Sequence, residues 1–124
     1  MLAIDSSSMI AFLNGDSGPD VDKLDWALEN SLAVLPPVVL CELLSDPDLN
    51  DDVREIFKSL PTLELQDGYW ERTGDLRSRV LKKGKRARLA DSLIAQSCID
   101  YEIPIISRDL DFRHFASEST LELV

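Results

Sequence analysis

The sequence has few of the residues on which many enzymes and small secreted proteins depend. Its 124 residues include a single histidine, His114, and two cysteines, Cys41 and Cys98, which lie far apart in apolar stretches. We therefore expect neither a disulfide framework nor a zinc site, and we interpret both cysteines as reduced core thiols of a cytoplasmic protein. A lone histidine with so few partners is typical of an ordinary surface side chain.

Long apolar runs and a basic leader are also missing. No window offers the roughly 18 uncharged apolar residues of a membrane span, and Asp5 ends the first apolar run with no basic residue before it. We therefore expect no membrane segment and no secretory signal. With 44% hydrophobic residues, the chain is predicted to form one domain, residues 1–124, around a substantial core.

Positive charge is scarce overall but concentrated in one segment. The chain carries 23 acidic and 13 basic side chains, for a formal net charge of −10. Residues 1–64 alone account for −10, whereas residues 72–88, the basic band, hold eight bases and one acid. A solvated helix end explains the basic band as well as a polyanion contact does, so the charge pattern leaves both open.

Short apolar runs alternate with helical patterns along the chain. Strands are predicted at 2–4, 32–35, 62–65, 103–107 and 121–124. Helices are predicted at 9–13 after serine N-caps, and at 21–30, 38–44, 53–60, 69–83 and 89–101. Because strands separated by helices form parallel sheets covered on both faces, the sequence predicts an α/β fold.

The helical spacing also predicts which side chains enter the core. The apolar face of the helix at 69–83 is expected to comprise five residues: Trp70, Thr73, Leu76, Val80 and Leu81. The helix at 21–30 is expected to use Val21, Leu24, Trp26 and Leu28. These assignments place both tryptophans on apolar helix faces.

Four carboxylates lie beside the predicted core. Asp5 ends the first predicted strand, and Asp109 follows the fourth. Asp91 lies at the start of the last helix, and Glu42 has only apolar neighbours. Each has an ordinary explanation as a cap, a first-turn acid or an ion-pair partner. If the four converge, they require a cation between them, and an all-oxygen site selects Mg²⁺ or Mn²⁺.

Four segments occur in a characteristic order: Ile4–Ser7, Val38–Leu44, Leu89–Ala95 and Ile105–Phe112. In this order and at this spacing, over nearly the whole chain, they make it resemble the PIN domain family and, within it, the VapC-like toxins of toxin–antitoxin pairs. The resemblance implies a three-layer α/β/α fold with a central parallel sheet of about five strands. It also implies a metal-dependent endoribonuclease with Mg²⁺ or Mn²⁺ as cofactor.

The resemblance further implies roles for individual residues. The catalytic and metal-binding cluster is Asp5, Glu42, Asp91 and Asp109. Ser6 and Ser107 match positions where the family keeps a small hydroxyl residue near the metal, and Asp111 is a second candidate for the position that we assign to Asp109. We hypothesise that a water activated by the metal attacks the scissile phosphate in line and leaves a 5′-phosphate and a 3′-hydroxyl.

Five bases of the basic band precede Asp91 and are the candidates for guiding RNA to the metal: Lys82, Lys83, Lys85, Arg86 and Arg88. Toxins of this kind form homodimers and are silenced by a cognate antitoxin whose tail lies across the groove, so both partners are expected.

Two alternatives stay open. One is a catalytically silent PIN-like module that binds RNA or a protein, and the other is a PIN nuclease of RNA processing outside toxin–antitoxin systems. A response-regulator receiver is disfavoured because serines follow Asp5 where that fold needs an acidic pair. Metal-dependent RNA cleavage tests the first alternative, and the neighbouring reading frame tests the second.

Overall fold

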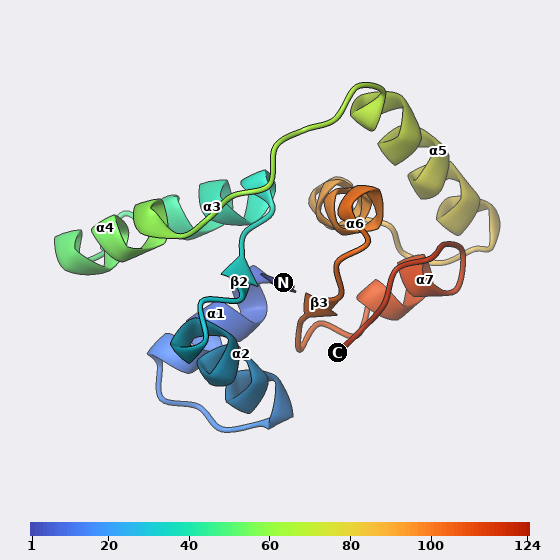
Figure 1. Cartoon of the computed structure of the whole chain (residues 1–124). Coiled ribbons are helices and arrows are strands. Elements are labelled where there is room, and N and C mark those ends of the chain that lie inside the picture. The colour runs from blue at the N-terminus through green and yellow to red at the C-terminus, as the bar shows by residue number, and fades with distance from the viewer.

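Seven helices surround a small parallel sheet in the computed structural model, which describes all 124 residues, Met1–Val124 (Figure 1). The strands are β1 (Leu2–Ile4), β2 (Ala33–Val34) and β3 (Ile105–Ile106). The helices are α1 (Ser6–Leu13), α2 (Pro19–Glu29), α3 (Pro37–Leu44), α4 (Asp51–Ser59), α5 (Tyr69–Lys82), α6 (Leu89–Tyr101) and α7 (Phe112–Ala116).

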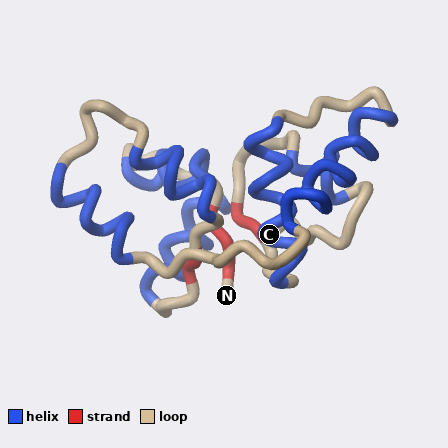
Figure 2. The backbone as a smooth tube through the Cα atoms, turned by 90° about the horizontal axis from the view of Figure 1, so that it is seen from above, coloured by secondary structure: helices blue, strands red, loops and turns tan.

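The sheet has the order β2-β1-β3, and all of its strands are parallel. Figure 1 places α1 and α2 below the strands and α3 and α6 above them. Figure 2 shows the strands in the middle of the molecule, between two groups of helices. The predicted α/β class, with helices on both faces of a parallel sheet, is confirmed.

The other two predicted strands are reduced to single bridges at the edges of the sheet. Thr62 forms a parallel bridge with Leu35, and Leu123 forms one with Ile105. Each bridge consists of two hydrogen bonds. The Leu35 N–H donates to the Pro61 carbonyl and the Leu63 N–H to the Leu35 carbonyl, while the Ile105 N–H donates to the Glu122 carbonyl and the Val124 N–H to the Ile105 carbonyl. The sheet therefore has three regular strands and five paired segments.

A contiguous core of 23 buried residues lies around the strands. Ala3 and Ile4 of β1 are completely buried, as is Ile106 of β3, which explains why these short runs contain no polar residue. The two isoleucines, Ile4 and Ile106, each contribute about 1.5–3 kcal/mol to folding through this burial. None of the helices combines the length and the hydropathy needed to cross a membrane.

Two helix faces differ from the prediction. In α5 the buried stripe begins at Tyr69 and continues through Thr73, Leu76 and Val80, while Trp70 and Leu81 are 65% and 46% exposed. The Tyr69 hydroxyl donates a 2.6 Å hydrogen bond to the Leu93 carbonyl, so Tyr69 and not Trp70 faces α6. In α2 the buried residues are Leu24 and Ala27, and Trp26 is exposed.

The cysteine prediction is correct for one residue and wrong for the other. Cys98 is buried, and burial raises the pKa of its thiol to about 12. Cys41 is exposed on α3, because Val39 and Leu43 carry the buried face of that helix. Helix α7 was not predicted, since its five residues are too few to show a helical period.

Candidate metal centre

The register of the sheet places the ends of β1 and β3 side by side. Ile4 pairs with Ile106, so the residues that follow them, Asp5 and Ser107, are neighbours. Ser107 Oγ donates to Asp5 Oδ2 at 2.8 Å. Asp5 is also the N-cap of α1, and Ser7 donates to the same oxygen through its backbone N–H and its hydroxyl. These donors all use Oδ2, which leaves Oδ1 of a nearly buried carboxylate without one.

Three further carboxylates meet at the same edge of the sheet. One oxygen from each of Asp91, Asp109 and Asp111 lies within 4.8 Å of the other two. The turn after β3 is fixed by its own side chains: the backbone N–H of Asp109 donates to Ser107 Oγ at 3.0 Å, and that of Asp111 donates to Asp109 Oδ1 at 2.9 Å. Asp91 comes from the first turn of α6. The structure thus groups Asp111 with Asp91 and Asp109, although the sequence ranked it below Asp109.

Glu42 is placed by the amphipathic character of α3. The apolar run that contains it buries Val39 and Leu43, and Glu42 lies on the exposed face. Its Oε1 accepts a 2.6 Å hydrogen bond from Ser6 Oγ at the start of α1. Glu42 therefore reaches the residue next to Asp5, although it lies outside the group of three carboxylates.

The electrostatics of Asp91 connect the four predicted acids. Burial raises the pKa of the Asp91 carboxyl to about 6, and the charges of Asp109 and Asp5 act in the same direction. Arg88 opposes this increase in the pKa, and Glu42 adds a smaller increase. The site therefore holds more negative charge than its neighbours compensate. An oxygen-only donor set with excess negative charge fits a hard divalent cation such as Mg²⁺ or Mn²⁺.

An ion pair that the sequence did not reveal fixes the turn after β3. Arg108 donates to both carboxylate oxygens of Asp20, from Nε at 2.9 Å and from a terminal guanidinium nitrogen at 3.0 Å. Ser8 Oγ donates to Asp20 at 2.8 Å. The hydrogen bond from Arg108 lowers the pKa of Asp20 to about 2. This latch, Arg108 with Asp20, holds the residue before Asp109 against the first turn of α2.

The five RNA-binding candidates are all exposed. Two of them lie beside the acids: a guanidinium nitrogen of Arg86 is 3.9 Å from Asp111 Oδ2, and the charge of Arg88 acts on Asp91. The loop that carries them is held by a 2.8 Å hydrogen bond from Arg77 Nε to the Ala87 carbonyl. The lysines lie at the other end of this loop, at the end of α5 and after it: Lys82, Lys83 and Lys85.

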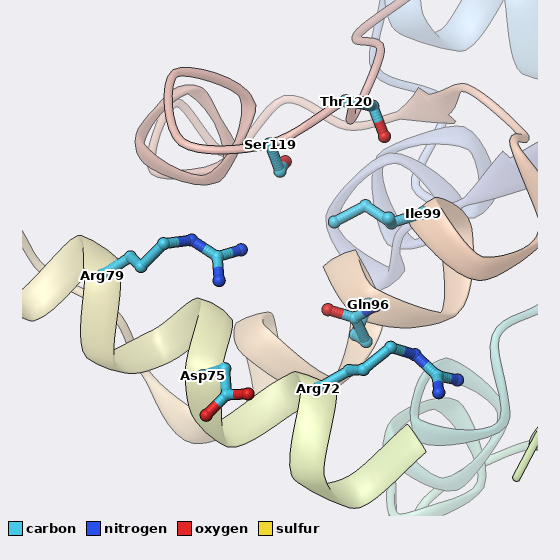
Figure 3. Close-up of a pocket in the computed structure, with 7 residues that line it drawn as sticks. All are labelled: Arg72, Asp75, Arg79, Gln96, Ile99, Ser119 and Thr120. Carbon is cyan, nitrogen blue, oxygen red and sulfur yellow. The ribbon is translucent and has the colours of Figure 1, made fainter. Parts of the chain in front are cut away.

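A cavity of about 320 Å³ between α5, α6 and the C-terminal segment is a different kind of site (Figure 3). Its only carboxylate is Asp75. Arg72 is already engaged, donating to both Asp100 oxygens at 2.9 and 2.7 Å. Figure 3 shows the guanidinium of Arg79 extending into the cavity, below Ser119. This donor set does not suit a divalent cation, and the Arg72–Asp100 pair serves to connect α5 to α6.

The PIN domain family model matches residues 2–118. The chain belongs to the PIN domain family. No curated protein sequence matches it. Among solved structures, VapBC2 from Rickettsia felis bound to a DNA fragment from their promoter is 18% identical, with a TM-score of 0.76 over 99% of this chain and 96% of that chain.

Two more solved structures share the fold. VapBC-5 from Mycobacterium tuberculosis, of the VapBC family of toxin–antitoxin systems, is 21% identical with a TM-score of 0.66, covering 98% of this chain and 95% of that chain. FitAcB from Neisseria gonorrhoeae is 16% identical with a TM-score of 0.70, covering 99% and 96%. These findings confirm the resemblance to PIN domains with a VapC-like fold. The roles of the individual acids stay predictions.

The latch makes a testable contribution to stability. We expect Asp20→Asn to lower the free energy of unfolding at pH 7 by about 1–2 kcal/mol, because it breaks a two-pronged, partly buried ion pair. Since folding lowers the pKa of Asp20 from 3.8 to about 2, the contribution is complete above pH 3.8 and is lost as the pH falls toward 2. Urea unfolding of both proteins at several pH values measures the difference.

Asp22→Asn is the matched control for this experiment, because Asp22 is exposed in the same helical turn. It is expected to leave stability within about 0.5 kcal/mol of wild type. A difference between Asp20→Asn and wild type that persists unchanged at pH 2 would show that the ion pair is not its source.

Proposed function

We propose that this PIN domain chain is a VapC-like toxin, a Mg²⁺- or Mn²⁺-dependent endoribonuclease. The observation that carries the proposal is the convergence of acids from separate parts of the chain. One carboxylate oxygen from each of Asp91, Asp109 and Asp111 lies within 4.8 Å of the other two, and Asp5 and Glu42 are close enough to raise the pKa of Asp91. Such crowding disfavours the metal-free protein and favours cation binding.

In this proposal Asp5, Glu42, Asp91 and Asp109 hold the metal, and Asp111 is a further candidate ligand. When bound, the ion supplies Lewis-acid stabilisation of phosphoryl oxygens and lowers the pKa of water. The serine side chains orient the acids. Ser107 fixes one oxygen of Asp5, and Ser6 holds Glu42. Because a hydrogen bond restricts the rotamer of a ligand, these serines prepare the site before the ion arrives.

Arg86 and Arg88 supply the opposite charge at the edge of this site. Both are exposed, and each is close enough to interact with one of the acids. In the proposal they bind the phosphates that flank the scissile bond, because guanidinium groups match phosphate geometry. The lysines of the same loop extend this contact along the RNA backbone.

The test is cleavage of total RNA in Mn²⁺, with and without EDTA, followed by mapping of the 5′ ends. We expect EDTA to abolish cleavage and Asp91→Asn to reduce it by on the order of 100-fold or more, because the amide withdraws a charged ligand. The variant is expected to fold with at least the wild-type melting temperature in the absence of metal, because it relieves repulsion among the carboxylates.

Asp25→Asn, the same chemical change at an exposed site on α2, is the matched control and is expected to cleave like wild type. Cleavage that survives in EDTA or in Asp91→Asn would refute the proposal. Retention of RNA without any metal-dependent product would instead support the alternative of a silent binding module.

We further propose that a cognate antitoxin occupies a groove of about 370 Å³ between α1, α3 and α4. Its lining includes Ile10 and Leu13, which are 50% and 47% exposed, and the buried Phe57. Acids lie among these apolar residues, including Glu42 and Asp46. A helix with an apolar face and basic residues matches such a groove. The structural neighbours from VapBC systems suggest that this helix belongs to an antitoxin.

Leu13→Asp tests the groove. Placing a charge on its apolar lining is expected to weaken binding of the protein encoded by the adjacent reading frame by at least about tenfold. RNA cleavage is expected to stay at the wild-type level, because Leu13 lies at the far end of α1 from Asp5. Co-purification and titration calorimetry measure binding.

Wild-type affinity in Leu13→Asp would place the antitoxin elsewhere. The absence of a small adjacent reading frame would favour a PIN nuclease of RNA processing. Assembly as a homodimer is also proposed, and light scattering of the purified protein tests it.

A further inference from the structure

A further cavity, of about 440 Å³, lies between the C-terminal half of α5 and the start of α6. We call it the α5–α6 notch, and its lining residues are Gly74, Arg77, Ser78, Leu81, Lys82 and Leu89. Its volume falls within the range of about 300–1,000 Å³ that is typical of ligand pockets. The proposed metal centre uses none of these residues.

The notch has free space above Gly74 and is bordered by the apolar side chains of Leu81 and Leu89. Gly74 has no atom within 4 Å of the position that a Cβ would occupy, so nothing in the fold requires glycine there for packing. Leu81 and Leu89 are 46% and 59% exposed, although both are large apolar side chains. Trp70, which is 65% exposed, precedes Gly74 by four residues and so lies on the same side of α5. The result is an uncovered strip of apolar surface.

The notch adjoins the acidic site through the chain itself. Leu89 is the first residue of α6 and directly follows Arg88, whose charge acts on Asp91. The loop between α5 and α6 contains Arg86 and Arg88, which interact with the acids. An extended ligand bound at the acids and across this loop therefore reaches the notch.

The charge around the notch selects the class of ligand. All but one of the residues that line the notch belong to the basic band. Neither Arg77 nor Lys82 forms an ion pair in the structure. A twofold pairing of two copies through this face would bring two basic bands together, which like-charge repulsion disfavours. An apolar surface surrounded by cations instead matches single-stranded nucleic acid, whose bases pack on apolar groups while its phosphates meet lysine and arginine.

We propose that the α5–α6 notch binds a nucleobase of the single-stranded RNA substrate, next to the nucleotides at the metal centre. The inference rests on the proposed ribonuclease function and extends it by naming a specificity subsite. Leu81 and Leu89 contact the base, Gly74 and Ser78 leave room for it, and Arg77 and Lys82 hold the adjacent phosphates. Binding here selects which RNA segments are aligned for cleavage, whereas the chemical step belongs to the acids.

To test the proposal, a leucine side chain introduced at Gly74 fills the notch. Gly74→Leu is compatible with the helical backbone and with the free space around Gly74. We expect it to lower kcat/KM for a single-stranded RNA about tenfold, the loss that corresponds to about 1.4 kcal/mol of apolar contact between the base and the two leucines. Hydrolysis of bis(p-nitrophenyl) phosphate in Mn²⁺, which requires only the metal centre, is expected to stay unchanged. Gly74→Ala, the matched control, is expected to behave like wild type with both substrates.

A binding measurement separates this proposal from the proposed function. Fluorescence anisotropy with a labelled single-stranded RNA in EDTA needs no cleavage, and Gly74→Leu is expected to weaken binding about tenfold there as well. Equal RNA binding and equal cleavage by Gly74→Leu and wild type would overturn the subsite. So would a parallel loss of RNA and bis(p-nitrophenyl) phosphate hydrolysis, or a change in oligomeric state on light scattering, which would assign the notch to a second copy. If wild type cleaves neither substrate, the proposed function fails while the binding result still decides on the notch.

Discussion

The parallel register between β1 and β3 is the constraint on which the rest of the site depends. The Asp5 backbone N–H donates to the Ile106 carbonyl at 2.9 Å, so the two strand ends cannot slide past each other. A shift of one residue would turn Asp5 toward the opposite face of the sheet and would break its contact with Ser107. The apolar strands thus fix the positions of polar groups that contribute nothing to the core.

The site concentrates like charges that the fold must tolerate without a cation. Asp91 shows that its ionised form is destabilised, since burial and neighbouring carboxylates raise the pKa of its carboxyl to about 6. Two features offset part of this repulsion. Asp5 accepts hydrogen bonds from Ser107 and Ser7, and Asp91 lies in the first turn of α6, at the positive end of the helix. The Arg108–Asp20 latch adds an ion pair next to the cluster without neutralising it. The negative charge of the acids is therefore only partly compensated, which is the condition that the proposed cation would relieve.

The sequence was most informative where local patterns decide the structure. Short apolar runs located the strands, and acids at the ends of those runs located the edge of the sheet where Asp5 and Asp109 lie. Prediction failed where a partner distant in sequence decides the outcome. Tyr69 rather than Trp70 enters the core because its hydroxyl reaches a carbonyl of α6. The pairing of Arg108 with Asp20, 88 residues away, likewise leaves no trace in local spacing.

Glu42 belongs to two surfaces at once, the groove between α1, α3 and α4 and the edge of the acidic site. It lines the groove between α1, α3 and α4, and it accepts a hydrogen bond from Ser6, which follows Asp5 directly. A partner that enters the groove with a basic side chain therefore meets a carboxylate that also acts on Asp91. Because charges this close affect one another, we expect occupation of the groove by such a partner to change the ability of the acids to hold a cation. The acidic N-terminal half and the basic band thus both act on Asp91, the first through Glu42 and the second through Arg88.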